Sequence, residues 1–169
     1  MTIQIADYDP AWPQKFRVEA AKILAALGAA AMRIEHVGST AVPGLPAKRI
    51  IDVVLVVQDS TKESAYVPSL EAAGYRFHHR EPHWFEHRML KGLDPSVNLH
   101  VFTEGCPEID KMLAFRDWLR AHSDDRDRYA RTKRDLASRE WKDSQDYADA
   151  KTPVIVEISS RGTAYLPTM

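Results

Sequence analysis

Two short features of the sequence could together bind a phosphorylated ligand. Gly38, Ser39 and Thr40 form a small polar turn after an apolar segment, and Asp52 interrupts the aliphatic run 50–57. A turn rich in Gly and Ser allows backbone N–H groups to converge on a phosphate. A carboxylate inside a buried strand needs a cation or hydrogen-bond donors, because burying an unpaired charge is costly. The pair predicts a phosphate-binding turn that faces an acidic residue, as in many sites for a nucleotide and its Mg²⁺.

Two basic residues between these features are candidates to neutralise phosphate charge. Lys48 and Arg49 directly precede the aliphatic run. An ammonium group and a guanidinium fork both suit phosphate oxygens. The alternative interpretation is ordinary surface charge beside a strand. In that case Asp52 pairs with one of these two side chains or caps a backbone turn.

A second set of candidates lies in the C-terminal third of the chain. Two Tyr–Lys pairs are each spaced four residues apart, which places ring and ammonium on the same face of a helix. A tyrosine can stack on a base, and a lysine can reach a phosphate. The alternative is a core tyrosine beside a lysine whose stem is buried and whose charge reaches solvent. The set comprises Arg116, Tyr129, Lys133, Tyr147 and Lys151.

The motif EHVGSTAVPGLPAKRIID at residues 35–52 closely resembles the hallmark of the GrpB family, also designated UPF0157. The spacing between Gly38-Ser39 and Asp52 is similar to the signature of the polymerase-beta-type nucleotidyltransferase superfamily. The resemblance covers nearly the whole chain. Further matches occur at residues 8–13, 98–101 and 115–120 and at the two Tyr–Lys pairs.

The resemblance implies a nucleotidyltransferase-like fold with a divalent ion, Mg²⁺ in the first instance. Such folds use three carboxylates, two of them at alternate positions of one strand, where both side chains point the same way. Here the alternate neighbours of Asp52 are Ile50 and Val54, and a later strand offers His100 where an acid is expected. The catalytic and metal-binding candidates are therefore Asp52 and His100, which could hold one ion but not a two-ion cage.

Other residues could supplement this incomplete set. Glu35, or less favourably Glu81 or Glu157, could supply a missing carboxylate, and His36 adjoins the central motif. A hydrogen-bonded core histidine is the commoner role for such a residue.

A separate metal site is conceivable in the histidine-rich segment 78–87. His83 and His87 are four residues apart, a spacing that binds Zn²⁺ when both lie on one helix face. The segment has strand character instead, and no third ligand stands at an obvious spacing.

Two functions of different classes follow from these residues. The first is an enzyme that transfers a nucleotidyl group from a nucleoside triphosphate to an unknown small acceptor. The second is a catalytically degenerate module that binds a nucleotide or another phosphorylated metabolite. GrpB-like domains also occur fused to dephospho-coenzyme A kinase, so a coenzyme-A-related ligand is conceivable for the module. Val54, in place of a second carboxylate, favours the second class.

The elements that must position these residues are an α+β set: a mixed sheet of about five strands with flanking helices and a C-terminal helical bundle. The apolar pattern predicts a helix from about residue 12 to Leu27, ended by Gly28, and a second helix at 64–73. We expect strands at 32–37, 50–57, 75–79, 84–90 and 97–103, with a further short strand at 3–5. The last two long strands should form a hairpin around residues 92–95.

From Pro107 onward the pattern becomes helical, and Ser123 starts a further helix. Segment 147–164 is ambiguous, because residues 154–158 are β-rich. The family resemblance implies a helix there, started or kinked by Pro153. We therefore expect a single domain over residues 1–169, with a sheet-containing core at 1–104 and a helical part at 105–169.

Length and composition limit the number of domains, the kind of partner and the cellular compartment. The chain has 169 residues, a formal net charge of −1 and a single cysteine, Cys106. This length suffices for one domain with a proper core, and the charge gives no bulk attraction to nucleic acid. One cysteine cannot form an internal disulfide, which favours a reducing compartment. The N-terminus does not read as a signal peptide and no apolar run is long enough to span a membrane, so we expect a cytoplasmic protein that binds a small phosphorylated molecule.

Overall fold

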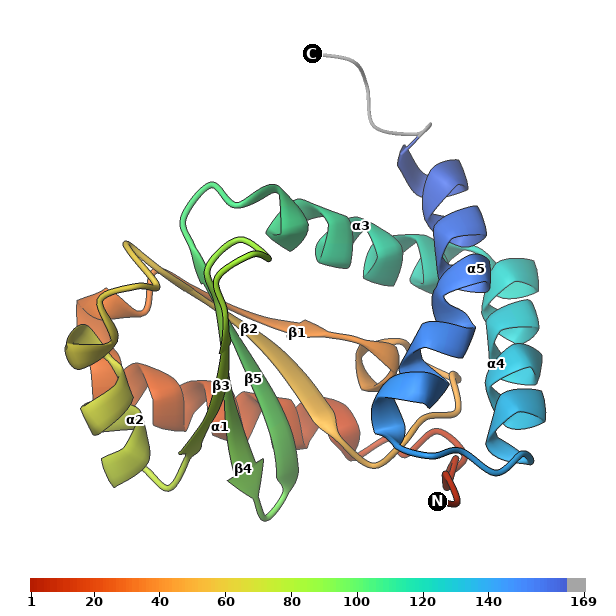
Figure 1. Ribbon diagram of the computed structural model, residues 1–169, viewed down its shortest axis with the longest axis horizontal. Helices are drawn as coiled ribbons and strands as arrows, with labels where there is room; N and C mark the ends of the chain where they lie inside the picture. The colour runs from red at the N-terminus through yellow and green to blue at the C-terminus, as the bar shows by residue number, and fades with distance from the viewer. Residues whose placement is uncertain (164–169) are drawn as a thin grey trace.

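A computed structural model describes residues 1–163 of the chain (Figure 1). The helices are α1 (Trp12–Leu27), α2 (Val67–Ala72), α3 (Pro107–Ala121), α4 (Ser123–Ala137) and α5 (Ser144–Thr163). The strands are β1 (Arg33–Val37), β2 (Ile51–Val57), β3 (Arg76–Glu81), β4 (His87–Leu93) and β5 (Ser96–Thr103). They form one five-stranded sheet in the order β1-β2-β5-β4-β3. Only the β2–β5 pair is parallel, so the predicted α+β fold with a mixed sheet is confirmed.

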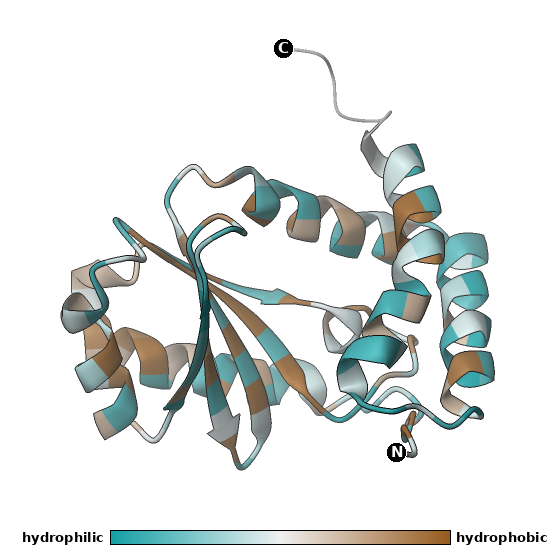
Figure 2. Ribbon diagram, in the orientation of Figure 1, coloured by the Kyte–Doolittle hydropathy of each residue, from teal (hydrophilic) through white to brown (hydrophobic). Residues whose placement is uncertain are grey.

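One face of the sheet is covered by α1 and α2 (Figure 1). Alternate residues of β2, which are Ile51, Val53 and Leu55, pack there against Trp12 and Ile23 of α1. Strand β2 is buried at six of its seven positions, and this explains its nearly continuous aliphatic sequence. Brown hydrophobic segments accordingly run along the central strands in Figure 2.

The opposite face of the sheet is divided between a helix and an open region. Val54 of β2 and Phe102 of β5 pack against Ile109 and Leu113 of α3. Asp52 lies on the same face as Val54, but two residues nearer the start of β2 and outside the apolar cluster under α3. The position that a second carboxylate would occupy is therefore part of a hydrophobic cluster.

The C-terminal helices hold the loop that follows Gly38. Residues Val42 and Leu45 of this loop are buried against Leu119, Tyr129 and Ile158, which come from α3, α4 and α5. Helix α5 lies beside α4 at one end of the sheet (Figure 1). The loop is thus packed between the sheet and the helices, with the short 3₁₀ turn Ser39–Ala41 next to Asp52.

Several boundaries differ from those expected. The short strand predicted at residues 3–5 is absent from the described part of the chain, where Ala6 forms only an isolated bridge with Ala47. The strand expected from residue 84 begins at His87, because Phe85 and Glu86 adopt positive φ angles of 54° and 52° in a turn.

The helices predicted at 64–73 and at 147–164 are both present, with changes in their bounds. The second helix is shorter than expected and begins at Val67. Helix α5 is present despite its β-rich sequence, with Pro153 inside it and Ile158 fully buried. Tertiary packing therefore overrides local propensity in this segment. Ala164, the last residue of the predicted helix, lies outside the described residues. No helix in the described part of the chain combines the length and the apolar character needed to cross a bilayer.

Candidate active site

A cavity of about 460 Å³ opens beside Asp52, between the uncovered part of the sheet and the start of α5. Its lining carries four lysines and a single carboxylate, and the charged side chains are Lys48, Lys91, Lys133, Lys151 and Asp52. Ser39, Thr40, Asn98, His100 and Tyr147 add polar groups. A cavity with this excess of positive charge suits an anionic ligand.

The predicted turn and the predicted carboxylate are in direct contact. Gly38 has a φ of 71°, and a Cβ atom built on it would lie 2.7 Å from Oδ2 of Asp52. Only glycine permits this approach together with this backbone conformation. The contact places the first residue of the turn against the carboxylate, as the spacing of the motif predicted.

The carboxylate of Asp52 is held by two side chains of the parallel neighbour β5. Its Oδ1 accepts a hydrogen bond of 3.0 Å from Nδ2 of Asn98 and lies 3.3 Å from Nε2 of His100. The β2–β5 register pairs Asp52 with Asn98 and Val54 with His100, so all three polar side chains share one face. Sequence reasoning did not select Asn98, although its alternation with His100 on one strand was a usable signal.

A chain of hydrogen bonds extends from Asp52 across the sheet; we call Glu81, His87, His100 and Asp52 the histidine chain. Nδ1 of His100 lies 3.1 Å from Nε2 of His87, and Nδ1 of His87 lies 2.6 Å from Oε2 of Glu81. Burial lowers the pKa of His87 to about 4, so its ring is neutral near pH 7.

The carboxylate of Glu81, at the outer end of this chain, sets the proton positions on the two histidine rings. A neutral His87 that donates from Nδ1 to Glu81 must accept at Nε2 from Nδ1 of His100. Nε2 of His100 then presents a lone pair toward the carboxylate of Asp52, and a cation between these two atoms would stabilise the arrangement.

Asp52 and His100 fit a divalent ion that takes only two of its ligands from the protein. Asp52 offers a carboxylate and His100 a ring nitrogen, and water and ligand phosphates could complete the shell, as is usual for Mg²⁺. No second carboxylate lines the cavity among the described residues. The residues therefore fit one ion rather than two.

Lys133 fixes the turn to α4. Its Nζ donates a hydrogen bond of 2.8 Å to Oγ of Ser39 and another to the carbonyl of Pro46. Only 2% of Lys133 is exposed, and burial, followed by the charge of Lys151, lowers its pKa to about 7. Tyr129, one helical turn earlier, is also buried and hydrogen-bonds the side chain of Ser39. Both residues support the turn, but only Lys133 of the two lines the cavity.

Two further lysines flank one tyrosine in the cavity. Nζ of Lys48 lies 4.6 Å and Nζ of Lys151 4.8 Å from the ring centre of Tyr147. Burial, then the charge of Lys48, lowers the pKa of Lys151 to about 8. Burial also lowers the pKa of Lys48. The hydroxyl of Tyr147 is the one buried side-chain polar atom without a partner in the described part of the chain. Like charges at close range and an unpaired hydroxyl together favour an anionic ligand with acceptor oxygens.

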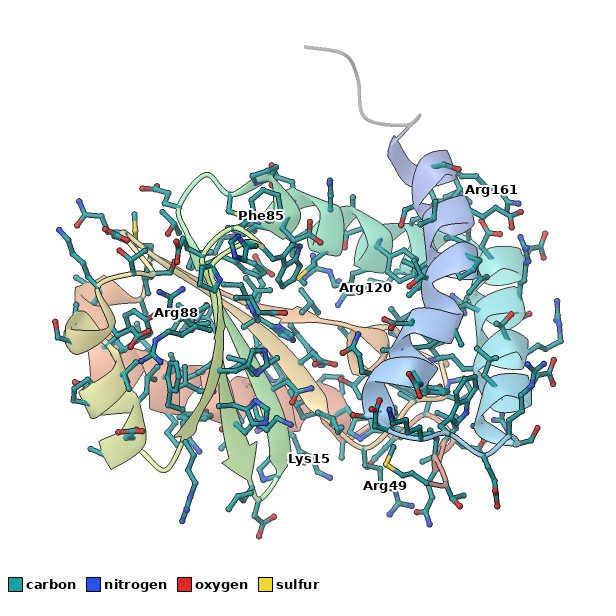
Figure 3. All side chains as sticks on the ribbon, in the orientation of Figure 1. Lys15, Arg49, Phe85, Arg88, Arg120 and Arg161 are labelled. Carbon is teal, nitrogen blue, oxygen red and sulfur yellow. The ribbon has the colours of Figure 1, made fainter. Side chains whose placement is uncertain are left out.

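Other predicted residues lie outside the cavity. Arg49 is exposed, and Figure 3 shows it at the edge of the molecule below α5. Glu35 shares the face of Asp52, but Nη1 of Arg116 and Nε of Arg33 each donate to its carboxylate at 3.0 Å.

His36 lies on the opposite face of the sheet. Its ring stacks on Phe16 of α1 at 4.7 Å, and its Nε2 lies 2.9 Å from Oγ1 of Thr40. Burial lowers its pKa to about 4. The residue therefore links the turn to α1 from behind the cavity.

Lys91 lines the cavity and was not predicted. Its register opposite Asn98 places it on the same face of the sheet. The sequence contained no local sign of this, because the offset between β4 and β5 is set by the hairpin.

Comparison with known proteins gives consistent results. Residues 2–161 match the family described as "GrpB protein". The UPF0157 protein BH1888 of Halalkalibacterium halodurans is 56% identical over 163 residues, which cover 96% of this chain and 84% of that protein. A crystal structure of the conserved protein GrpB from Enterococcus faecalis has a TM-score of 0.84 and 29% identity, covering 95% of this chain and 98% of that one. A dephospho-CoA kinase of Mycolicibacterium paratuberculosis is 30% identical over 177 residues, covering 89% of this chain but 44% of the kinase.

Proposed function

The chain belongs to the GrpB family, and on that premise we propose that it is a nucleotidyltransferase that uses a nucleoside triphosphate, a divalent ion and a small acceptor. One observation carries the proposal: the turn at Gly38 touches Asp52 inside a cavity that carries four lysines. An acidic residue within such a cavity would weaken anion binding on its own. It is useful where a cation must sit between the carboxylate and the phosphates.

The residues have separable roles in this proposal. Ser39 and the backbone of its turn contact the terminal phosphates, which Lys48 and Lys151 neutralise. Asp52 and His100 would hold the divalent ion, which would supply charge neutralisation at the α-phosphate. The acceptor hydroxyl attacks the α-phosphorus, its proton passes to Asp52, and the bond to the bridging oxygen breaks to release pyrophosphate. Positioning and electrostatic stabilisation account for most of the rate.

Pyrophosphate release tests the proposal directly. The protein is incubated with each labelled nucleoside triphosphate, Mg²⁺ or Mn²⁺ and a mixture of small metabolites. We expect metal-dependent release that falls roughly tenfold or more in Lys151→Met, because one phosphate counterion is lost. Lys111→Met is the matched control, since the Lys111 side chain is 66% exposed on α3 and remote from the cavity. Absence of release with every triphosphate would contradict the enzymatic proposal.

A binding module is the second candidate function, and one observation favours it. The position of the second carboxylate is filled by Val54, which packs under α3. Such a protein would bind a nucleotide or another phosphorylated metabolite without turnover. A coenzyme-A-related ligand is one option, given the similarity to part of a dephospho-CoA kinase. Tight nucleotide binding that a chelator leaves unchanged, without pyrophosphate release, would support this module.

Binding of ATP near pH 8.5 should take up protons. Lys133 and Lys151 have pKa values of about 7 and 8, so both are largely neutral at that pH. Bound phosphates favour the charged forms and raise both pKa values, whereas near pH 6 both groups are already charged.

Calorimetry in two buffers with different ionisation enthalpies would measure this uptake. We expect about one proton per bound ATP near pH 8.5, less in Lys151→Met, and the wild-type value in Lys111→Met. Uptake that is the same near pH 6 and pH 8.5 would show that the cavity lysines do not contact the ligand.

Three broader expectations remain proposals. We propose a cytoplasmic location, which the single cysteine supports. We propose a small phosphorylated molecule rather than nucleic acid as the partner, because the basic groups converge in a cavity. We also retain the proposal of one domain, with the sheet in residues 1–104 and the helical part in 105–169.

A further inference from the structure

A second cluster of metal-ligating side chains lies at the far end of the histidine chain. His79, Glu81 and His87 each offer one ligand atom, and these three atoms lie within 4.8 Å of one another. We propose that this outer cluster binds a transition-metal ion of the Zn²⁺ class. None of its three residues lines the cavity beside Asp52.

The sheet brings these three side chains together. Glu81 of β3 pairs directly with His87 of antiparallel β4. His79 stands two residues before Glu81 and so points to the same face. The register shift in β3 lies between Phe77 and His79, before both ligands, so regular alternation continues from His79 to Glu81. The ligands therefore come from regular strands rather than from loops.

The ring of His87 is held in place before any ion binds. It is 1% exposed and contacts the rings of Trp84 at 4.7 Å and Phe102 at 4.9 Å. Its Nε2 faces Nδ1 of His100 at 3.1 Å, while Nδ1 points to the outer cluster. A metal-ligating histidine usually donates its second ring N–H to a fixed acceptor. His100 can be that acceptor for His87.

The other two ligands leave the outer side accessible. The side chains of His79 and Glu81 are 41% and 43% exposed, so an ion can enter and water can complete its shell. Two imidazoles and one carboxylate form a set found in zinc sites. Imidazole nitrogen favours Zn²⁺ or Co²⁺ over Mg²⁺, which prefers oxygen.

Ion pairing alone offers a competing explanation of this cluster. Oε2 of Glu81 lies 2.6 Å from Nδ1 of His87 and 3.5 Å from Nε2 of His79, which are also distances of hydrogen-bonded pairs. The two explanations differ in what they predict for added metal. Simple pairing requires no selectivity for Zn²⁺ over Mg²⁺, whereas the proposed site does.

Calorimetric titration with Zn²⁺, together with the visible absorption of added Co²⁺, tests the inference on the intact chain. We expect one Zn²⁺ equivalent bound at the outer cluster, which excess Mg²⁺ weakens but does not displace, and a Co²⁺ spectrum characteristic of nitrogen ligands. His79→Ala and Glu81→Gln should each weaken Zn²⁺ binding by roughly tenfold to 100-fold. Both side chains are partly exposed, so we expect both variants to fold, which circular dichroism can verify.

Two control variants separate this site from the others. His83→Ala removes an exposed histidine outside the cluster and should leave Zn²⁺ affinity unchanged. Asp52→Asn removes the carboxylate of the cavity and should also leave the outer site filled. No Zn²⁺ binding, or binding that survives both His79→Ala and Glu81→Gln, would overturn the inference. Loss of binding in Asp52→Asn alone would place the ion in the cavity instead and equally overturn it.

Discussion

Replacing Asp52 with asparagine should lower metal-dependent pyrophosphate release by at least about 100-fold, because it removes the only carboxylate that lines the described cavity. The asparagine has nearly the same shape, and its amide oxygen can still accept the hydrogen bond from Asn98. The change therefore removes charge rather than packing. We expect the free energy of unfolding to stay within about 1 kcal/mol of the wild-type value.

A second measurement on Asp52→Asn separates charge from folding. Without a divalent ion, the carboxylate repels phosphate in a cavity otherwise lined by lysines, so the variant should bind ATP more tightly than the wild type in the presence of a chelator. Asp7→Asn is the matched control, because its side chain is 89% exposed and remote from the cavity. Equal turnover in Asp52→Asn and wild type would refute the assigned role of this carboxylate.

Replacing Gly38 with alanine should produce the second large effect, a loss of stability of about 2–4 kcal/mol. Gly38 has φ 71° and ψ −173°, a region that costs side-chain-bearing residues about 1–3 kcal/mol. The new Cβ would also lie 2.7 Å from Oδ2 of Asp52, so either the turn or the carboxylate must move. Urea denaturation followed by circular dichroism measures the loss.

Gly44→Ala provides the comparison for Gly38→Ala. Gly44 has a φ of 81°, but a Cβ atom there would have no heavy atom within 4 Å. Its substitution should therefore cost only the backbone strain, about 1–2 kcal/mol, and leave turnover unchanged. If the two alanine variants lost equal stability and kept equal activity, the close approach of Gly38 to Asp52 would contribute neither to stability nor to turnover.

Local patterns were sufficient to predict most of the fold. The aliphatic run around Asp52 could only be a buried strand, and Gly28 and Pro107 marked helix boundaries. The approach of the turn to Asp52 followed from one motif, since few residues separate the two. Helix α5 is different, because its β-rich residues become helical only through packing on α3 and α4. The residues alone left that segment ambiguous.

The rest of the site depends on register, which no local pattern encodes. Asn98 contacts Asp52, and Lys91 lines the same cavity, because β4, β5 and β2 are aligned at particular offsets. A shift of one residue in any strand would turn these side chains to the other face. The same parity places His36 behind the sheet. The partners of Glu35 were equally hidden, because Arg116 is 81 residues away in the sequence.

The histidine chain has a direction, and this has a consequence for the two candidate ion sites. With Glu81 accepting from His87, every proton along the chain points away from Asp52, and His100 presents a lone pair to the cavity. An ion on Nδ1 of His87 would move the proton of His87 to its Nε2 and the proton of His100 to its Nε2, so that His100 donates to Asp52 instead. Zinc outside and a divalent ion inside would then be mutually antagonistic across two imidazoles. Thermodynamic linkage requires each to weaken the other by the same factor.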